Sequence, residues 1–482
     1  MKAQKTLFFI ISVLLLLGFV SLVFPKKGIT FGDRQLYFPT IEDILSKKDH
    51  SSTTASQRIT DLEEGLSMQQ TQHDSLYYDS LSFYIAFFQN HPSRMHLPEG
   101  NWNYFDDLFE TFDHCKERNE VVHILHYGDS QIEGDRITGN IRQKLQEKFG
   151  GIGPGLLPAV QVIPSTAVGQ TASENIERYI ISGMHQNKAP HRRYGALGQV
   201  GMTAGESYIS VSARNWKTTA EKVKEFQKIR LFVGRPSANF KANLSVPNQA
   251  VLKRTISDKK EPVEVLSWTL DEPVKKFSLR IIGSGEIYGI AADGTYGIAM
   301  DNIPFRGSSG TFFNSMDSTV LSSMLAYLNT KLVLLEFGGN TIPGIKNDKI
   351  IESYKNKMSE QIAYFRRLCP EAKIILIGPA DMSTKVNGKL QTHPRLEKVV
   401  EALKEAALEN GAAFWNMYEV MGGKNSMIDW VKNSPSLAAP DYIHFSTKGA
   451  ERIADLFYES LLVYYDYYNF KKEHGNNEKM KE

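Results

Sequence analysis

The sequence contains few cysteines and no excess of charge of either sign. Among 482 residues only Cys115 and Cys369 are cysteines, which excludes a disulfide-rich scaffold and a zinc site of four cysteines. The sequence leaves open whether these two pair, because a disulfide requires a specific geometry. Lys and Arg number 56 and Asp and Glu number 54, so the formal net charge is +2. This balance provides no overall field for binding nucleic acid.

Long hydrophobic runs are equally scarce, and the one that stands out lies at the N-terminus. Lys2 and Lys5 precede residues 7–24 (LFFIISVLLLLGFVSLVF), which carry no charge. As a helix this run would span about 27 Å, close to the hydrocarbon thickness of a bilayer. A cleaved signal peptide usually has a shorter apolar core. We therefore expect residues 1–27 to anchor the chain in the cell membrane as a single span, with a cleaved signal as the alternative. The remainder is expected to be extracytoplasmic, in the periplasm or at the cell surface.

The composition is that of a folded protein, with 41% hydrophobic and 23% charged residues. Residues 28–118 are interpreted as a stalk and a helical lead-in, with a polar linker at 49–57 (DHSSTTASQ). The aromatic-rich stretches 77–89 and 104–112 predict helices that pack on the main domain. The alternative for them is an exposed aromatic surface that stacks on sugars. Residues 471–482 are expected to be a polar tail.

Alternating strand and helix patterns follow in two separate pieces of the chain, 119–160 and 296–470. The first piece has a short apolar run at 121–127 (VVHILHY), typical of a buried parallel strand, and helical spacing at 135–149. The second piece continues with strands and helices in turn, at 331–337, 349–368, 373–378, 395–409, 412–416 and after 446. This alternation predicts a parallel α/β sheet, wound on both faces by helices with right-handed crossovers.

The alternation is absent between the two pieces, at 161–295. That segment instead contains short stretches rich in β-branched residues and separated by turn residues, at 208–213, 229–235, 263–268, 276–282 and 286–291. They predict a β-sandwich domain inserted into the α/β domain. Insertion is physically easy where the two ends of the guest lie close together.

A serine follows the first predicted strand directly, in the sequence Gly128-Asp129-Ser130-Gln131. Ligands of open α/β sheets bind outside the carboxyl ends of the strands, so this serine is expected at the chemically useful edge. We also expect the next helix to direct its N-terminal amides near it. A Gly-Asp-Ser turn alone is weak evidence, because turns and helix caps favour the same residues.

Three later segments supply partners for a nucleophilic serine. Asp441 and His444 lie three residues apart near the C-terminus, and such a pair can provide a base and the anion that orients it. Asn340 follows the strand 331–337, where its amide could donate to an oxyanion. The glycine-containing loop 301–310 (DNIPFRGSSG) also follows a predicted strand.

These four blocks together resemble the SGNH (GDSL-type) hydrolase superfamily, over residues 121–154 and 296–462. The string 127–158, with a β-rich insertion after the first block, is similar to the peptidoglycan O-acetylesterase group. The resemblance implies a flavodoxin-like α/β domain, and it implies that the inserted sandwich is a carbohydrate-binding module.

The resemblance also implies residue roles. It makes Ser130 the nucleophile, His444 the base and Asp441 the group that orients the base. The expected oxyanion hole has three donors, the Ser130 amide, the Asn340 side chain and the Gly307 amide. Gly310 is the alternative to Gly307, which we prefer because it is closer to the strand end. Gln131 departs from the leucine that commonly follows the nucleophile, and we expect it to affect substrate preference.

The function predicted from the sequence is a serine esterase that removes O-acetyl groups from an extracytoplasmic glycan, with peptidoglycan the favoured polymer. No metal and no cofactor are expected. An O-acetyltransferase with the same triad is the first alternative, because both reactions share their first half. A non-catalytic glycan-binding protein is the second. The sequence does not identify the glycan, the acylated position or the oligomeric state.

Overall fold

The computed structural model describes residues 29–31, 34–36, 77–183, 185–216, 219–257 and 261–479. The chain divides into two compact units, 1–57 and 58–482. In the first unit, β1 (Ile29–Phe31) pairs antiparallel with β2 (Arg34–Leu36). The predicted anchor at 1–27 lies outside the described residues. Within them, no helix is both long enough and apolar enough to cross a membrane.

The second unit is built on a six-stranded sheet. Its strands, in spatial order, are β16 (Gly297–Pro304), β4 (Val121–Gly128), β17 (Thr330–Glu336), β18 (Lys373–Ile377), β21 (Ala413–Trp415) and β3 (Met95–His96). Neighbours from β16 to β21 run parallel, and β3 pairs antiparallel with β21. If the parallel strands are numbered in chain order, their spatial order is 2-1-3-4-5, which is the flavodoxin-like doubly wound arrangement. The predicted parallel α/β sheet is confirmed.

Helices cover both faces of this sheet. One face carries α7 (Ser318–Tyr327), α8 (Asp348–Leu368) and α9 (Leu396–Glu409). The other carries α5 (Asp106–His114), α6 (Thr138–Phe149) and α12 (Thr447–Lys479). Side chains of β17 alternate between the two cores: Val333 and Leu335 pack in the first, and Leu332 and Leu334 in the second. Burial on both faces explains why the strand sequence is a continuous apolar run.

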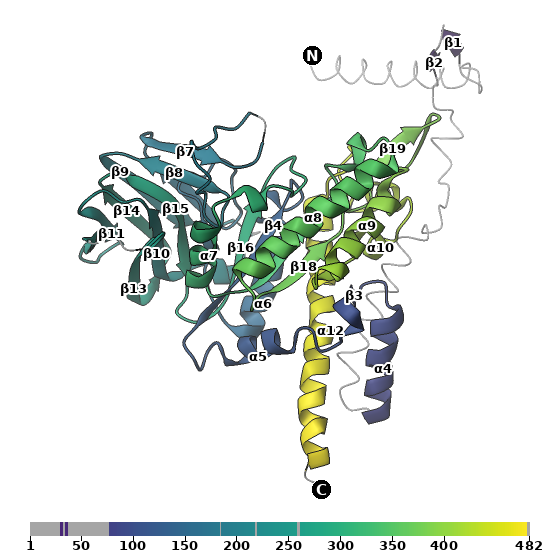
Figure 1. Cartoon of the computed structure of the whole chain (residues 1–482), viewed down its shortest axis with the longest axis horizontal. Coiled ribbons are helices and arrows are strands. Elements are labelled where there is room, and N and C mark those ends of the chain that lie inside the picture. Colours follow the sequence, from purple (N-terminus) through teal and green to yellow (C-terminus); the bar gives the residue numbers. More distant parts are fainter. Residues whose placement is uncertain are drawn as a thin grey trace, which may run out of the picture. The chain divides into compact units, whose positions relative to one another are not determined.

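The aromatic-rich lead-in is part of the second core. In α4 (Tyr77–Asn90), Tyr84, Phe87 and Phe88 are buried, and Phe88 stacks on Tyr464 of α12 with ring centroids 4.7 Å apart. Figure 1 shows α4 beside α12. These buried rings cannot form the sugar-stacking surface that the sequence left as an alternative. The remaining short elements are α10 (Met417–Val420), α11 (Ser426–Lys432), β19 (Ser383–Val386) and β20 (Lys389–Thr392).

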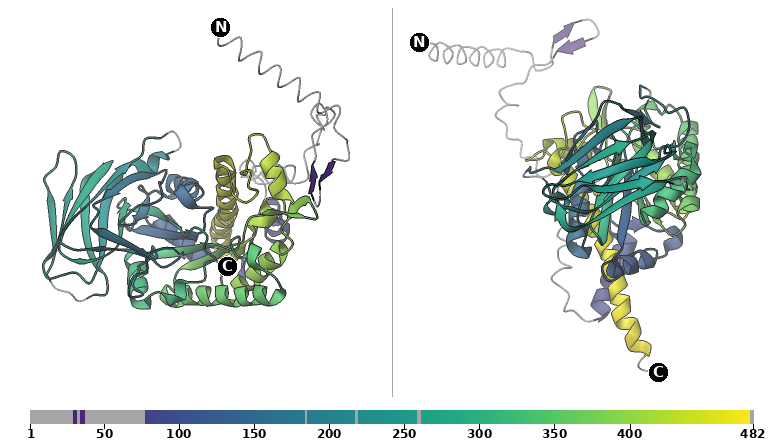
Figure 2. Two further views of the ribbon diagram at one scale, coloured as in Figure 1. Left: turned by 90° about the horizontal axis from the view of Figure 1, so that it is seen from above. Right: turned by 90° about the vertical axis from the view of Figure 1, so that its left-hand side faces the viewer.

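The segment between α6 and β16 forms two antiparallel sheets that face each other. One contains β5 (Gly155–Leu157), β7 (Ile176–Ile180), β8 (Gln199–Thr203), β10 (Phe226–Gly234), β13 (Glu264–Val274) and β15 (Gly285–Asp293). The other contains β6 (Val168–Ala172), β9 (Glu206–Ala213), β11 (Phe240–Ser245), β12 (Leu252–Ile256) and β14 (Lys276–Ile282). This β-rich insertion lies to one side of the α/β part (Figures 1 and 2). It begins with β5, before the predicted boundary at 161, because β5 pairs with β15.

A buried network of charged and polar groups joins the insertion to the central sheet. His123 Nδ1 of β4 lies 2.8 Å from Asp301 Oδ2 of β16, and His123 Nε2 lies 2.8 Å from Arg230 Nη2 of β10. Because a guanidinium only donates, Nε2 accepts from Arg230 and Nδ1 donates to Asp301. Arg230 also pairs with Asp293 at 2.8 Å, and Asp301 Oδ1 accepts from the Leu156 amide at 2.6 Å. The insertion is thus bonded to the central sheet through its interior.

Both cysteines are buried and free. Cys115 packs in the core beneath α5 and α12, whereas Cys369 packs in the core on the opposite face of the sheet. The central sheet separates them, so they do not form a disulfide.

Substituting Asp301→Ala should lower the free energy of unfolding by about 2–6 kcal/mol, because the buried His123 Nδ1–H and the Leu156 amide each lose an acceptor at about 1–3 kcal/mol. Asp348→Ala is the control, because Asp348 is 65% exposed and pairs with Arg395 and Lys398 at the surface. Its cost should be much smaller, because exposed ion pairs contribute little to stability. Urea unfolding measures both. Equal destabilisation by the two changes would contradict the importance given to the buried network.

Candidate active site

Ser130 lies just beyond the carboxyl end of β4, where the sheet changes its winding direction. β4 ends at Gly128 and has β16 on one side and β17 on the other. The chain connections leave in opposite directions at this point, which opens a crevice for ligands. The helix predicted at 135–149 begins at Thr138, and a turn and the short helix η2 (Glu133–Asp135) lie between it and Ser130.

Ser130, His444 and Asp441 are brought together although His444 is 314 residues from Ser130 in the chain. Ser130 Oγ lies 2.9 Å from His444 Nε2, and His444 Nδ1 lies 2.7 Å from Asp441 Oδ2. The carboxylate accepts the Nδ1 proton, so Nε2 presents its lone pair to the serine hydroxyl. This is the geometry in which an imidazole can remove the proton of a serine nucleophile.

The loop that carries Asp441 and His444 is held in one conformation by its own backbone. Asp441 Oδ1 accepts from the Ile443 and His444 amides at 2.9 and 3.0 Å. Tyr442 has φ +59°, in the left-handed region, and this turn places the carboxylate beside the ring three residues later. Partial burial by itself would raise the pKa of Asp441, but the bonds from His444 and from the backbone amides outweigh it and lower that pKa. Asp441 therefore remains an anion.

The chain resembles known proteins both in sequence and in fold. Residues 291–452 match the GDSL-like Lipase/Acylhydrolase family. A solved structure of a peptidoglycan O-acetylesterase superposes with a TM-score of 0.62 at 22% identity, over 76% of this chain and 98% of the other.

The chain has the SGNH hydrolase fold.

A family two carbohydrate esterase from Cellvibrio japonicus is also similar to this chain, with a TM-score of 0.24 and 10% identity over 62% of this chain and 98% of the other. No curated protein matches in sequence. The family match contains Asn340, Asp441 and His444 but not Ser130, because the β-rich insertion separates the Gly-Asp-Ser block from the rest of the fold. The family match supports an acylhydrolase, and the superposition shows a shared fold.

Two side chains bind the serine loop to the histidine loop. Gln131 Nε2 donates to Ile443 O at 2.8 Å, and its Oε1 accepts from the Phe445 amide at 3.2 Å, so one amide bonds to both neighbours of His444. Arg136 donates to Ser130 O at 2.7 Å and to Phe445 O at 3.1 Å. Sequence reasoning gave Gln131 a part in substrate preference. Its bonds also make it a positioning residue, although no local sequence signal reveals contacts over such a separation. Because Gln131 lines the cavity that contains Ser130, its part in substrate preference stays a prediction.

Asn340 projects from the loop after β17, and its amide is already engaged. Nδ2 donates to Asp129 Oδ2 at 2.6 Å and to Ser308 O at 3.1 Å. An oxyanion at Ser130 would therefore have to share or replace one of these bonds. Asp129, adjacent to the serine, was not singled out by the sequence beyond its place in the turn, yet it determines how the Asn340 amide is oriented.

The two candidate glycines differ in their surroundings. Gly310 is buried, its amide donates to Ser308 Oγ at 3.1 Å, and a Cβ there would lie 2.5 Å from the Phe337 ring. Gly307 is exposed and has φ +73° with open space where a Cβ would be. Neither glycine lines the cavity that contains Ser130. The occupied amide of Gly310 makes Gly307 the better remaining candidate, and its role stays a prediction.

Ser130 and His444 line a cavity of about 190 Å³. Its other walls are largely apolar, formed by Pro343, Pro379, Ala380, Met382 and Met417. Burial raises the pKa of Asp129, which also lines it, to about 7, although the Gln131 amide bond opposes this and the nearby Glu336 carboxylate adds to it. Within the described part of the chain, no cluster of three His, Cys, Asp or Glu side chains is placed to hold a metal ion.

Replacing Gln131→Leu should lower kcat on a small ester by about tenfold, the effect of losing roughly 1.4 kcal/mol of hydrogen bonding that holds His444. KM should change little if the side chain positions His444, and mainly KM should change if it contacts substrate. Gln227→Leu is the matched control, because Gln227 also donates to backbone carbonyls, at 3.2 and 3.3 Å, but within the insertion. A KM effect alone would reject the positioning role.

The raised pKa of Asp129 also predicts a pH dependence of stability. Between pH 4 and 7 the folded state keeps a proton on this carboxyl that the unfolded state has lost, since an unperturbed aspartate titrates near ~3.9. Rising pH should therefore destabilise the wild type relative to Asp129→Asn, by at most about 1.4 kcal/mol per pH unit, and the difference should level off above pH 7. Unfolding of both proteins at several pH values measures it. A difference that does not vary with pH would mean that Asp129 is ionised throughout.

Proposed function

We propose that the chain is a membrane-anchored serine esterase that removes O-acetyl groups from an extracytoplasmic glycan, with peptidoglycan the polymer we favour. The observation that carries the proposal is the continuous contact from Ser130 Oγ through the His444 ring to Asp441. The apolar run at residues 7–24 supports the anchor, and an anchor would hold the site close to the cell wall.

In the proposed reaction, Ser130 Oγ attacks the acetyl carbonyl and its proton passes to His444 Nε2. The resulting imidazolium is stabilised by the Asp441 carboxylate. The ester bond to the sugar then breaks, the sugar oxygen takes the proton from His444, and the acetyl group remains on Ser130. Water attacks this acyl-enzyme, His444 accepts its proton, and acetate leaves as the serine recovers the proton.

Charge on the carbonyl oxygen requires hydrogen-bond donors at the tetrahedral stage. We assign the Ser130 amide and the Asn340 side chain to this role, with the Gly307 amide as third donor. Asn340 can contribute only by giving up a bond to Asp129 or to Ser308, at 2.6 and 3.1 Å. The longer bond is the cheaper one to give up.

The size of the site supports a small acyl group. A cavity of about 190 Å³ with apolar walls has room for an acetyl methyl beside Ser130 and little room for a long chain. A sugar ester is supported by the similarity to a protein described as a peptidoglycan O-acetylesterase. Transfer of the acetyl group to a sugar hydroxyl would use the same acyl-enzyme, so the acceptor distinguishes the two reactions.

Incubating the purified chain with O-acetylated peptidoglycan should release free acetate, and Ser130→Ala should reduce release to background. Ser309→Ala is the control, because Ser309 is a partly buried serine in the neighbouring loop after β16 and contacts only Thr311 through its hydroxyl. It should retain most of the activity.

An added soluble glycan acceptor separates the alternatives in the same experiment. Acetyl groups that appear on the acceptor instead of in solution would identify a transferase. Absence of both products would remove acetylated peptidoglycan from the proposal, and release that survives in Ser130→Ala would remove the nucleophile.

A further inference from the structure

A second cavity, of about 340 Å³, lies between α6 and the β-rich insertion. It begins beside the active site, because Arg136 and Thr447 line it and each follows closely after Ser130 or His444 in the chain. Arg136 itself bonds to the carbonyl oxygen of Ser130. The far wall is formed by Trp216 of the insertion. None of the residues that line this cavity carries a step of the proposed reaction.

Trp216 is unusually placed for a tryptophan of this chain. It is 46% exposed, whereas Trp268, Trp415 and Trp430 are fully buried. The guanidinium of Arg214 lies 4.3 Å from its ring centre and covers one ring face. A large aromatic surface left in water costs free energy unless something binds it, and a flat ring supported from behind is suited to stacking.

The polar groups of the cavity are suited to an uncharged ligand. Its buried charges are already paired, Asp135 with Arg142 at 2.7 Å and Glu133 with Arg306 at 2.5 Å. Carboxamides line the same cavity from α6, including Gln143. Amides both donate and accept hydrogen bonds, which is what sugar hydroxyls require.

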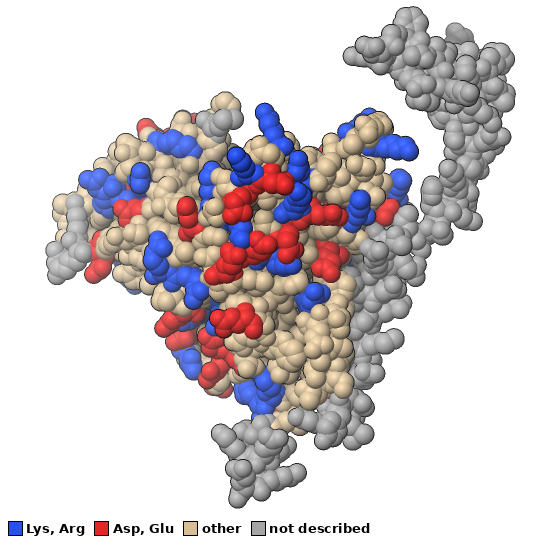
Figure 3. All heavy atoms as spheres, turned by 45° about the vertical axis from the view of Figure 1, so that its right-hand side comes forward, with Lys and Arg blue, Asp and Glu red and all other residues tan. Residues whose placement is uncertain are grey.

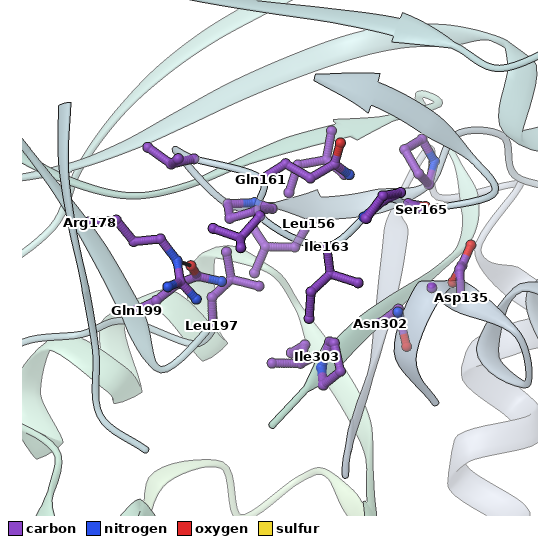
Figure 4. Close-up of a pocket in the computed structure, with 18 of the residues that line it drawn as sticks. Asp135, Leu156, Gln161, Ile163, Ser165, Arg178, Leu197, Gln199, Asn302 and Ile303 are labelled. Atoms are coloured by element: carbon purple, nitrogen blue, oxygen red, sulfur yellow. Dashed lines mark hydrogen bonds between the residues drawn. The ribbon is translucent and has the colours of Figure 1, made fainter. Parts of the chain in front are cut away.

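The cavity continues along the junction between the two parts of the chain. An adjoining hollow of about 100 Å³ shares Asp135 and Pro164 with it. In Figure 4, Asp135 lies at one end of this hollow and Arg178 with Gln199 at the other, with Ile163 between them. Arg178 Nε donates to Gln199 Oε1 at 2.9 Å, so this charge too is satisfied by an amide. We call the two adjoining hollows the junction groove.

We propose that the junction groove is a subsite for a glycan strand, in which Trp216 stacks on the apolar face of a sugar ring while the carboxamides bind its hydroxyls. This inference rests on the proposed function, since it assigns the groove to the polymer whose ester Ser130 would cleave. A polyanion is disfavoured because the charges that line the groove balance, with three carboxylates (Glu133, Asp135 and Glu451) against three guanidinium groups (Arg136, Arg142 and Arg178). On the face in Figure 3, charges of both signs are interspersed in the same balanced way.

Binding is measured directly with the full-length chain carrying Ser130→Ala, kept in detergent because of the apolar run at 7–24, by sedimentation with insoluble peptidoglycan. Trp216→Ala should raise the apparent Kd at least about tenfold, the scale for a tryptophan at the centre of a contact. Trp216→Phe should restore most of the affinity. Tyr208 is the matched control, since it is also 46% exposed on the insertion but lies on β9, away from the groove. Tyr208→Ala should bind as the parent does.

A second variant, Gln143→Ala on the opposite wall, should also weaken binding, which guards against a folding defect confined to the Trp216 loop. Binding unaffected by Trp216→Ala, an equal loss in Tyr208→Ala, or no binding by the parent would each overturn the subsite. Turnover of a small acetyl ester by the chain with Ser130 intact is followed in parallel, and Trp216→Ala should leave it unchanged. Binding that depends on Trp216 without any ester turnover would reject the esterase and keep the subsite. Ester turnover without binding that depends on Trp216 would keep the esterase and reject the subsite.

Discussion

The active site depends on holding two loops from distant parts of the chain in contact. A hydroxyl and an imidazole must lie within hydrogen-bond reach, here 2.9 Å, for the proton to move. The loop of Ser130 is fixed by the end of β4, while the loop of His444 is held by its own turn, by the Ser383 amide that donates to Tyr442 O at 3.0 Å, and by α12 behind it. The cross-links from Gln131 and Arg136 supply the missing restraint. The pocket, the orientation of the base and the entry to the junction groove all follow from this single contact.

The β-rich insertion also helps to fix the position of Ser130. It enters the crossover that connects β4 to β16, the two strands whose spacing determines where Ser130 lies. The buried network of His123, Asp301 and Arg230 bonds that crossover to the guest domain. The insertion is therefore part of the framework of the catalytic sheet and not a pendant module, which is consistent with a groove built from both.

Periodicity in the sequence was sufficient to predict the long elements and the order of the site blocks. Strands such as 121–127 and 373–378 are continuous apolar runs because both of their faces are buried, and they are recognisable for that reason. The two-residue strand β3 and the start of β5 carry no such pattern, because pairing with a partner far along the chain defines them. The contacts of Gln131 and the engagement of Asn340 by Asp129 were not predictable for the same reason. The anchor at 1–27 lies outside the described residues and stays a prediction.

The strand order has a consequence for how the enzyme is made. Ser130 belongs to the first parallel strand of the sheet, whereas His444 follows the last one, and the whole insertion is translated between them. A nascent chain therefore exposes its hydroxyl long before any base can reach it. A product truncated before residue 441 would have a nearly complete sheet and an inert serine. In the proposed mechanism, Ser130 therefore gains its base only after synthesis passes the histidine loop and α12 packs against α6.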